Sequence, residues 1–358
     1  MNKRLDISFP YTSKTEWMAL IKAGLKGKPI EDLNVEFEPT HSISPFQHLE
    51  DTSPEANAPL GLNDNRILEI GEDLTNLNFS SVNKYALDAL TYGANTLRVS
   101  TQILESVTSI EQALNGIHLD MIHLDFVPDS DLPIDTALLH YRNYIDSLPD
   151  SSNITAEIAM SPNQLEDFII KHRDIYEALN GQYMTRWVQF HTAISNPIST
   201  LTGMFTDLIS LMECGHEIGV NAFGSLKIEV EAGEDFLTNI AALRAIHILL
   251  ANLKRHAQDT DRAPFITGSV LQNVENMDPR LGYIPVTYKA MSLLSGGAQR
   301  LYLKISPQNE ESNRIVRNIN HLLTLESDYN LVSDPAAGSY YIENLTLEIV
   351  KSVWDNLI

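Results

Sequence analysis

Cysteine is almost missing from this chain of 358 residues, in which Cys214 stands alone. One cysteine cannot form an internal disulfide, so a reducing compartment, the cytoplasm, is expected. Long hydrophobic runs are missing too, since no apolar stretch approaches the roughly 20 residues that a membrane span requires. The amino terminus, MNKRLDISFPYTSKTEW, lacks the uninterrupted apolar core of a secretory signal.

Basic residues are scarce as well. The chain has 25 lysines and arginines against 47 aspartates and glutamates, a formal net charge of −22. Nucleic acid and anionic membrane surfaces would be repelled by such a chain, which leaves proteins and small molecules as partners. The composition, with 43% hydrophobic and 20% charged residues, is that of an ordinary globular protein.

Residues 1–60 are expected to form an arm and a linker outside the main domain. Ser13 and Glu16 fit a capping box, and an apolar helical face follows from Trp17 to Leu25. The run LNVEFEP (33–39) predicts a short strand. The proline-containing segment 44–64 shows no periodicity, which indicates an extended linker.

Beyond the arm, eight short apolar or alternating runs are separated by helical patterns. They cover residues 66–70, 95–100, 121–127, 154–160, 186–192, 226–232, 264–270 and 300–306. This alternation predicts a (β/α)8 TIM barrel over residues 61–330, an α/β fold. The rival is a doubly wound open sheet, but EIGEDL (69–74) has one glycine where the dinucleotide-binding turn needs three.

Reacting groups in such barrels lie where the strands end and the following loops begin. This rule selects the following side chains: Glu157, His191, Glu231, Ser269, Gln272 and Lys304. His191 could be a general acid, because its charge changes near neutral pH, or a histidine satisfied by core hydrogen bonds. Glu157 and Glu231 could be the acid/base pair of a glycosidase, yet ITGSV (266–270) lacks the carboxylate that many barrel glycosidases carry.

The sequence does not predict a metal site. His123 and Asp125 alternate to the same side of an expected strand, but no third ligand is found at a usable spacing. Gly296 and Gly297 precede the last expected strand, so they fit the end of a helix better than a phosphate-binding loop.

Segments in the last third of the chain resemble a known family. They are IAALRAIHILLANL (240–253), YKAMSLLSGGAQRLYL (288–303) and RIVRNINHLLTLES (314–327), which runs into VSDPAAGSYYIENLT (332–346). Their order and spacing resemble the acyl-CoA mutase barrel of the methylmalonyl-CoA mutase family. The similarity covers about residues 95–358, and the arm resembles the start of the small subunit in two-subunit members.

This resemblance implies a radical rearrangement that interconverts methylmalonyl-CoA and succinyl-CoA. Adenosylcobalamin supplies the radical in the family, and the barrel threads CoA along its axis. The protein's share of such chemistry is binding, orientation and exclusion of water. The implied partner is a homologous large catalytic subunit in a heterodimer, with the arm as a subunit contact.

Departures from the family's catalytic pattern imply that this chain is the small, non-catalytic subunit. His191 matches the catalytic histidine, but the Gln-Thr-Ser-Gly-Trp pattern after the seventh strand is replaced by GSVLQ (268–272). Ser269 and Gln272 are left as candidates for substrate contacts, and an arginine of the pattern falls on Pro285. The Asp-x-His-x-x-Gly string, whose histidine ligates cobalt, is absent. Adenosylcobalamin is therefore expected on the partner, and the barrel axis of this chain is expected to be filled by side chains.

Two other functions stay open. One is a self-sufficient barrel enzyme that uses His191 and Glu231 as acid and base. The other is a purely structural partner that binds no ligand.

The string LVSDPAAGSYYIENLT (331–346) contains neither a nucleophile beside a base nor metal-ligand spacing. Its Asp-Pro step and Gly338 predict a turn with positive φ, followed by a short extended piece at 340–342. Asn344 or Thr346 is expected to cap a last helix. This helix is still amphipathic at Ile358, so residues 331–358 are expected to be a post-barrel strand, turn and helix start of a longer, truncated protein.

Overall fold

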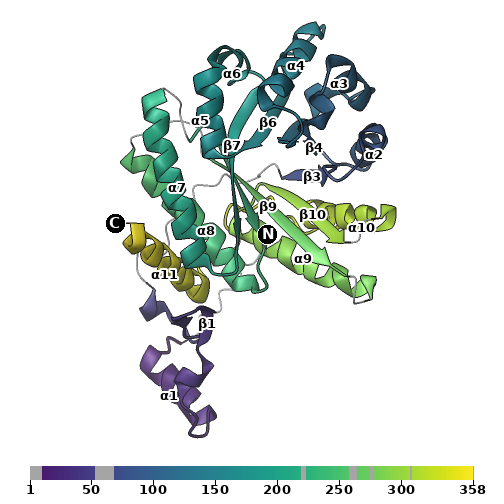
Figure 1. The fold of residues 1–358 in the computed structure, drawn as a ribbon. Helices are drawn as coiled ribbons and strands as arrows, with labels where there is room; N and C mark the ends of the chain where they lie inside the picture. Colours follow the sequence, from purple (N-terminus) through teal and green to yellow (C-terminus); the bar gives the residue numbers. More distant parts are fainter. Residues whose placement is uncertain are drawn as a thin grey trace, which may run out of the picture.

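The computed structural model describes residues 10–52, 68–218, 223–257, 264–274, 278–306 and 309–357. Its centre is a closed barrel of eight parallel strands in the order β10-β3-β4-β5-β6-β7-β8-β9, surrounded by helices (Figure 1). The strands are β3 (Glu69–Asp73), β4 (Thr96–Ser100), β5 (His123–Val127), β6 (Thr155–Met160), β7 (Met184–Ala193), β8 (Leu226–Glu231), β9 (Phe265–Asn273) and β10 (Arg300–Ser306). The predicted (β/α)8 barrel is confirmed, and each expected strand overlaps an observed one.

Helices cover the outside of the barrel. They are α2 (Phe79–Thr91), α3 (Val107–Ala113), α4 (Ile134–Ser147), α5 (Pro162–Lys171), α6 (Arg173–Leu179), α7 (Pro197–Ile218), α8 (Phe236–His256), α9 (Pro279–Gly296) and α10 (Glu310–His321). Short turns η4 (Thr101–Leu104) and η5 (Leu119–Met121) follow β4 and precede β5, and η6 (Leu322–Glu326) extends α10. Polar side chains start several helices: Ser161 accepts from the Gln164 N–H in a capping box, and Asp235 accepts from the Thr238 N–H.

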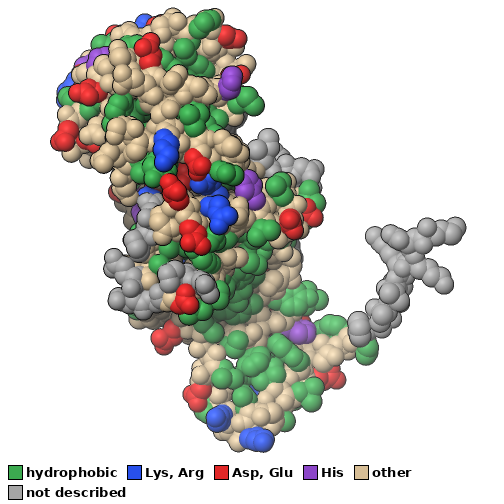
Figure 2. All heavy atoms as spheres, turned by 90° about the vertical axis from the view of Figure 1, so that its right-hand side faces the viewer, with side chains coloured by type: hydrophobic (Ala, Val, Ile, Leu, Met, Phe, Trp, Pro, Cys, Tyr) green, Lys and Arg blue, Asp and Glu red, His purple; other side chains and the backbone are tan. Residues whose placement is uncertain are grey.

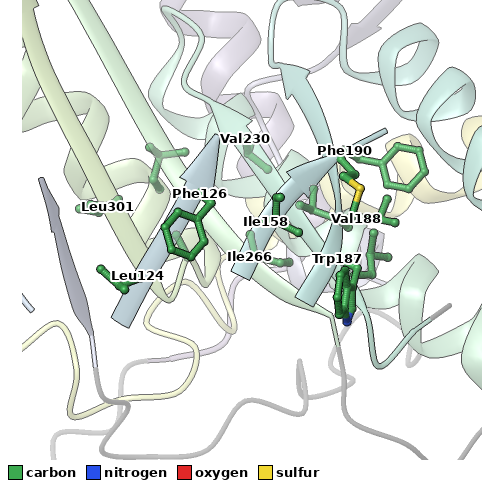
Figure 3. Close-up of a cluster of buried hydrophobic side chains, with 14 of the residues drawn as sticks. Leu124, Phe126, Ile158, Trp187, Val188, Phe190, Val230, Ile266 and Leu301 are labelled. Carbon is green, nitrogen blue, oxygen red and sulfur yellow. The ribbon is translucent and has the colours of Figure 1, made fainter. Parts of the chain in front are cut away.

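The outward side chains of the strands form the main hydrophobic core with these helices. Figure 3 shows Phe126, Ile158, Trp187 and Val230 within this cluster, and all four are buried. The Trp187 ring packs beside Phe168, and its Nε1 donates to Asn180 Oδ1 at 2.8 Å. Burying each such side chain stabilises the fold by about 1.5–3 kcal/mol.

A bulge in β7 controls which of its residues face the barrel interior. The N–H groups of Trp187 and Val188 both donate to the Ser225 carbonyl, at 2.8 and 3.0 Å. Two successive residues therefore face the outer core, so that Arg186 below them and Gln189 above them both bond to side chains inside the barrel.

One described helix, α8, is long and apolar enough to cross a membrane, but 67% of that stretch is buried inside the protein. It packs against α9 on one side and against the last helix, α11 (Tyr340–Leu357), on the other. This burial is typical of a core helix in a folded domain.

The amino-terminal arm has a docked part and a projecting part. Helix α1 (Lys14–Gly24) begins with the predicted Ser13–Glu16 capping box, but none of its residues is buried, and it projects beyond the barrel (Figure 1). Turn η1 (Ile30–Leu33), the hairpin β1 (Val35–Glu38) and β2 (His41–Ile43), and turn η2 (Leu49–Asp51) follow. The hairpin confirms the strand expected at 33–39, whereas residues 53–64 of the expected linker lie outside the described residues.

The hairpin docks through an apolar contact and a helix cap. Phe37 and Ile43 are buried in the main core. The Glu38 carboxylate accepts the N–H groups of Ile198 (2.6 Å) and Ser199 (3.0 Å) at the start of α7. A carboxylate in this position satisfies free N–H groups and faces the positive end of the helix dipole.

The extended piece expected at 340–342 is wrong, because α11 already begins at Tyr340. Gly338 has the predicted positive φ, +83°, and ends a run of turn residues. The backbone can therefore enter a helix immediately after the glycine, where the Glu343 N–H donates to the Ser339 carbonyl at 2.9 Å. Neither Asn344 nor Thr346 caps the helix, since both lie inside it.

Replacing Glu38 with glutamine is expected to lower the free energy of unfolding by about 1 kcal/mol, because the charge at the start of α7 is lost. Urea denaturation followed by circular dichroism measures this difference. Glu36→Gln, an exposed residue of the same strand, is the matched control and should change stability by less than about 0.5 kcal/mol. Equal stabilities of the two variants would contradict the capping role.

Candidate functional site

The interior of the barrel is filled by charged side chains rather than by apolar ones. Four cations and four carboxylates from seven different strands form this interior ion network: Arg98, Arg186, Lys227, Arg300, Glu69, Asp125, Glu157 and Glu229. All but Glu69 are buried. The equal numbers of opposite charges let the network exist in a region from which water is largely excluded.

Two ion pairs of this network cross the full width of the barrel. Arg98 on β4 donates from Nη1 to Glu229 Oε1 (3.1 Å) and from Nη2 to Oε2 (2.5 Å) on β8, which is four strands away around the ring. Arg300 on β10 bonds to Glu157 on β6, again four strands away. Since opposite walls are joined through the lumen, no extended ligand can pass along the axis.

Lys227 ties the two central carboxylates together. Its Nζ bonds to Asp125 and donates to Glu157 Oε1 at 2.9 Å. Asp125 also accepts from Arg98 Nε (2.7 Å) and from the Tyr302 hydroxyl (2.9 Å). These bonds of Lys227 and Asp125 form a second layer next to the two ion pairs that cross the barrel.

These contacts set the ionisation of the central groups. Burial would raise the pKa of the Glu157 carboxyl, but Arg300, Lys227 and the His123 hydrogen bond hold this pKa well below its ordinary value. Burial likewise opposes ionisation of Asp125, yet Arg98 and Lys227 lower its pKa. Burial and the neighbouring Asp125 raise the pKa of Tyr302, so its hydroxyl keeps the proton that it donates. Glu157 is consequently an ionised structural group and cannot be the proton donor considered from the sequence.

His191 and Glu231 meet at the mouth of the barrel, where the strands end. His191 Nε2 lies 3.8 Å from Glu231 Oε2, and the side chains are 51% and 40% exposed. Figure 2 shows the side of the molecule on which β9 ends, with histidine, acidic and basic side chains grouped on it. The distance is too long for a hydrogen bond, so the two groups are neighbours rather than a bonded acid/base pair.

The other predicted residues are not gathered into one site. Ser269 is paired in register with Glu231 and lies near this mouth, but Gln272 is three residues further along and donates to the neighbouring Asn273 carbonyl at 3.1 Å. Lys304 donates to Asp73 Oδ2 at 2.9 Å. The roles of His191, Ser269 and Gln272 therefore stay predictions.

The rule that places site residues at strand ends does not predict the interior ion network. Its sequence signal is a polar or charged residue at every second position of an otherwise apolar strand, as in TLRVS (96–100) and LKIEVE (226–231). His123 and Asp125 are the possible metal ligands named from the sequence. In the structure they belong to the network, where His123 lies 3.0 Å from Glu157 and Asp125 accepts from Arg98. Among the described residues, no group of three or more possible ligands could hold a metal ion.

A separate buried charge lies outside the barrel wall. Glu72 of β3 faces α10, where its Oε2 is 3.2 Å from Arg317 Nε. Burial raises the pKa of Glu72 to about 7, although the Arg317 charge opposes this shift. Asp88 and Asp73 raise this pKa further, and Lys304 lowers it.

Replacing Lys227 with methionine is expected to lower the free energy of unfolding by about 3–5 kcal/mol, because Asp125 and Glu157 lose a buried cation. Denaturant unfolding measures the loss. The exposed Lys84, 3.8 Å from Glu310, provides the control: Lys84→Met should cost less than about 1 kcal/mol. A loss for Lys227→Met as small as that of the control would refute the interior ion network.

Glu72 predicts a pH dependence of stability. Its pKa is higher in the folded than in the unfolded chain, so its contribution is complete below about pH 4.5 and is lost as pH rises through about 7. The loss is on the order of 3 kcal/mol between these limits. Glu72→Gln should therefore become more favourable relative to the parent as pH rises from 5 to 8, measured by denaturant unfolding at each pH. A difference between the two proteins that stays constant with pH would show that Glu72 does not titrate in this range.

Comparisons with known proteins match the chain to proteins of one name. A family model described as methylmalonyl-CoA mutase matches residues 206–358. The methylmalonyl-CoA mutase of Cereibacter sphaeroides is 32% identical over 145 residues, which are 37% of this chain and 20% of that protein. The methylmalonyl-CoA mutase small subunit of Streptomyces virginiae is 27% identical over 180 residues, 46% of this chain and 29% of that protein.

A longer match extends through the arm. The methylmalonyl-CoA mutase small subunit of Porphyromonas gingivalis is 22% identical over 402 aligned residues, covering 98% of this chain and 63% of that protein. The chain thus spans less than two thirds of the length of each of these three relatives. The carboxyl-terminal part of the chain thus matches the methylmalonyl-CoA mutase family model, and a small subunit of that name aligns along nearly all of the chain.

Proposed function

We propose that this chain is the small, non-catalytic subunit of an adenosylcobalamin-dependent methylmalonyl-CoA mutase in the cytoplasm. It would support a homologous large subunit that carries out the interconversion of methylmalonyl-CoA and succinyl-CoA. The observation that carries this proposal is the interior ion network, in which Arg98–Glu229 and Arg300–Glu157 join opposite walls of the barrel.

A filled interior is incompatible with the way the family is expected to use its barrel. A CoA ester threaded along the axis would have to displace both crossing ion pairs. Removing one partner of a buried pair costs about 3–5 kcal/mol, and a pantetheine chain offers no charges to replace these bonds. The barrel of this chain therefore serves as a rigid body rather than as a substrate channel.

Adenosylcobalamin does not fit the described residues of this chain. Buried, ion-paired side chains close the barrel interior beneath the mouth. His191 lies beside Glu231 at this mouth, above the filled interior. Two cavities lie outside the barrel, between its helices. One of about 550 Å³ is lined by residues of α2 and α10, and one of about 360 Å³ is lined by residues of α4 and α5. The cofactor would thus belong to the partner subunit.

The arm supplies the surface on which the partner would dock. No residue of α1 is buried, and Leu20, on its apolar face, is 69% exposed. Trp17 packs edge-on against Phe46, with ring centres 6.0 Å apart, so the projecting part is held as one piece. An amphipathic helix held away from its own domain is typical of a segment that is covered in an assembly.

A second candidate function rests on the His191–Glu231 pair at the mouth. Two partly exposed titratable groups 3.8 Å apart could exchange a proton with a small substrate there. Such an enzyme would need neither the axis of the barrel nor a partner.

The isolated chain is expected to bind neither succinyl-CoA nor adenosylcobalamin in calorimetric titrations, because the interior offers no channel. Mixed with a longer mutase chain that contains the Asp-x-His-x-x-Gly string, it should form a stable complex in size-exclusion chromatography and support mutase activity. Leu20→Asp should weaken this complex, whereas Glu36→Asp, which also places an aspartate at an exposed position of the arm, should not.

Stoichiometric cobalamin binding by this chain alone would refute the proposal. Turnover by the isolated chain that disappears in His191→Ala would instead establish the second candidate. A mutase chain that is fully active and never forms the complex would leave this chain without the proposed role.

A further inference from the structure

The segments that carry the family resemblance meet around one buried arginine. Arg244 of α8 is 1% exposed, and its Nη1 donates to Asp334 Oδ1 (2.7 Å) and Oδ2 (2.6 Å). Its Nη2 donates to Glu343 Oε2 at 2.7 Å. Asp334 and Glu343 both belong to the string 331–346, so the two segments are joined by charge-assisted hydrogen bonds.

The turn between Asp334 and Glu343 donates a backbone hydrogen bond to each of these carboxylates. Asp334 Oδ1 also accepts from the Ala336 N–H (3.3 Å), and Glu343 Oε1 accepts from the Gly338 N–H (3.0 Å). Gly338 adopts φ +83°, which a residue with a side chain rarely adopts. Each carboxylate therefore accepts an N–H group of the turn and also binds Arg244.

Apolar side chains seal the same contact. Ile240 of α8 packs with Ala336 and Ile342, and Phe236 and Tyr341 cover their sides. This small cluster is separate from the main core and excludes water from the neighbouring ion pairs.

Helix α11 in turn holds part of the arm. It packs along α8 and α7 and touches η2, and Figure 1 shows it between the barrel helices and the arm. Asn344 Nδ2 donates to Gln47 Oε1 at 2.6 Å. One helix thus connects the barrel to the segment 44–52.

We propose that Arg244, Asp334 and Glu343 form a latch that fixes α11 on α8 and, through α11, fixes the segment 44–52. The latch orders this segment before any partner is present, whereas the hairpin of β1 and β2 docks on the barrel through its own contacts. Its importance for assembly rests on the proposed function, but its effect on this chain does not.

The latch can be tested by hydrogen–deuterium exchange with mass spectrometry on the whole chain. Arg244→Met leaves two carboxylates facing each other without a cation. We expect exchange about tenfold faster or more in residues 340–357 and 44–52, with the strands β4 and β5 unchanged, because local elements open independently of the global core. Arg255→Met, an exposed position on the same helix, is the control and should leave all of these segments unchanged.

Unchanged exchange in residues 340–357 of Arg244→Met would overturn the latch, and so would equal acceleration in the barrel strands. Asp334→Asn offers a milder test, because Arg244 keeps Glu343; it should show the same pattern with a smaller increase. Failure of both variants to fold would place these ion pairs in the global core and would also contradict the proposal. The experiment needs no partner, so its outcome is independent of whether the chain assembles with a mutase.

Discussion

The pairing of charges inside the barrel is the constraint on which the rest of the structure depends. A charge in a water-excluded interior must find an opposite charge or lose its ionisation, and here four cations meet four carboxylates. The pairs link strands that are opposite in the ring, so they specify barrel closure and strand register together. A register slip by one residue in β8 would turn Lys227 and Glu229 toward the outer core. It would break the bonds of Lys227 with Asp125 and of Glu229 with Arg98. The bulge in β7 belongs to the same constraint, because it lets Arg186 and Gln189 both reach the interior.

Because paired charges fill the lumen, the accessible features of the described residues lie at the mouth and on the outer surface of the molecule. A barrel that must admit a cofactor and a long thioester needs small side chains along its axis, whereas this one joins its walls through Arg98 and Arg300. The features left to carry function are the mouth around His191, the projecting helix α1 and the helix α11 that connects barrel and arm. Two of these three are surfaces rather than cavities, and a surface of this kind can be covered by another protein.

The strands could be predicted because each one follows a local rule, a short apolar or alternating run between helical patterns. The capping box at Ser13 and the positive φ of Gly338 are local in the same sense. The interior network could not be predicted, because Arg98 and Glu229 are 131 residues apart and Arg300 and Glu157 are 143 apart. Only the closed barrel decides which charge meets which. The start of α11 was missed for a related reason: Tyr340, Tyr341 and Ile342 have strand propensity, but packing of Ile342 against Ile240 outweighs it.

The same reasoning explains why a sequence string can identify a family without taking part in its chemistry. Arg244, Asp334 and Glu343 are buried together, so the loss of Arg244 leaves two carboxylates without their cation at a cost of about 3–5 kcal/mol. A residue at the barrel mouth carries no such penalty: His191 and Glu231 are partly exposed and water can solvate either one alone. Substitutions at the mouth are therefore tolerated by the fold, whereas loss of the Arg244 cation leaves two buried carboxylates facing each other.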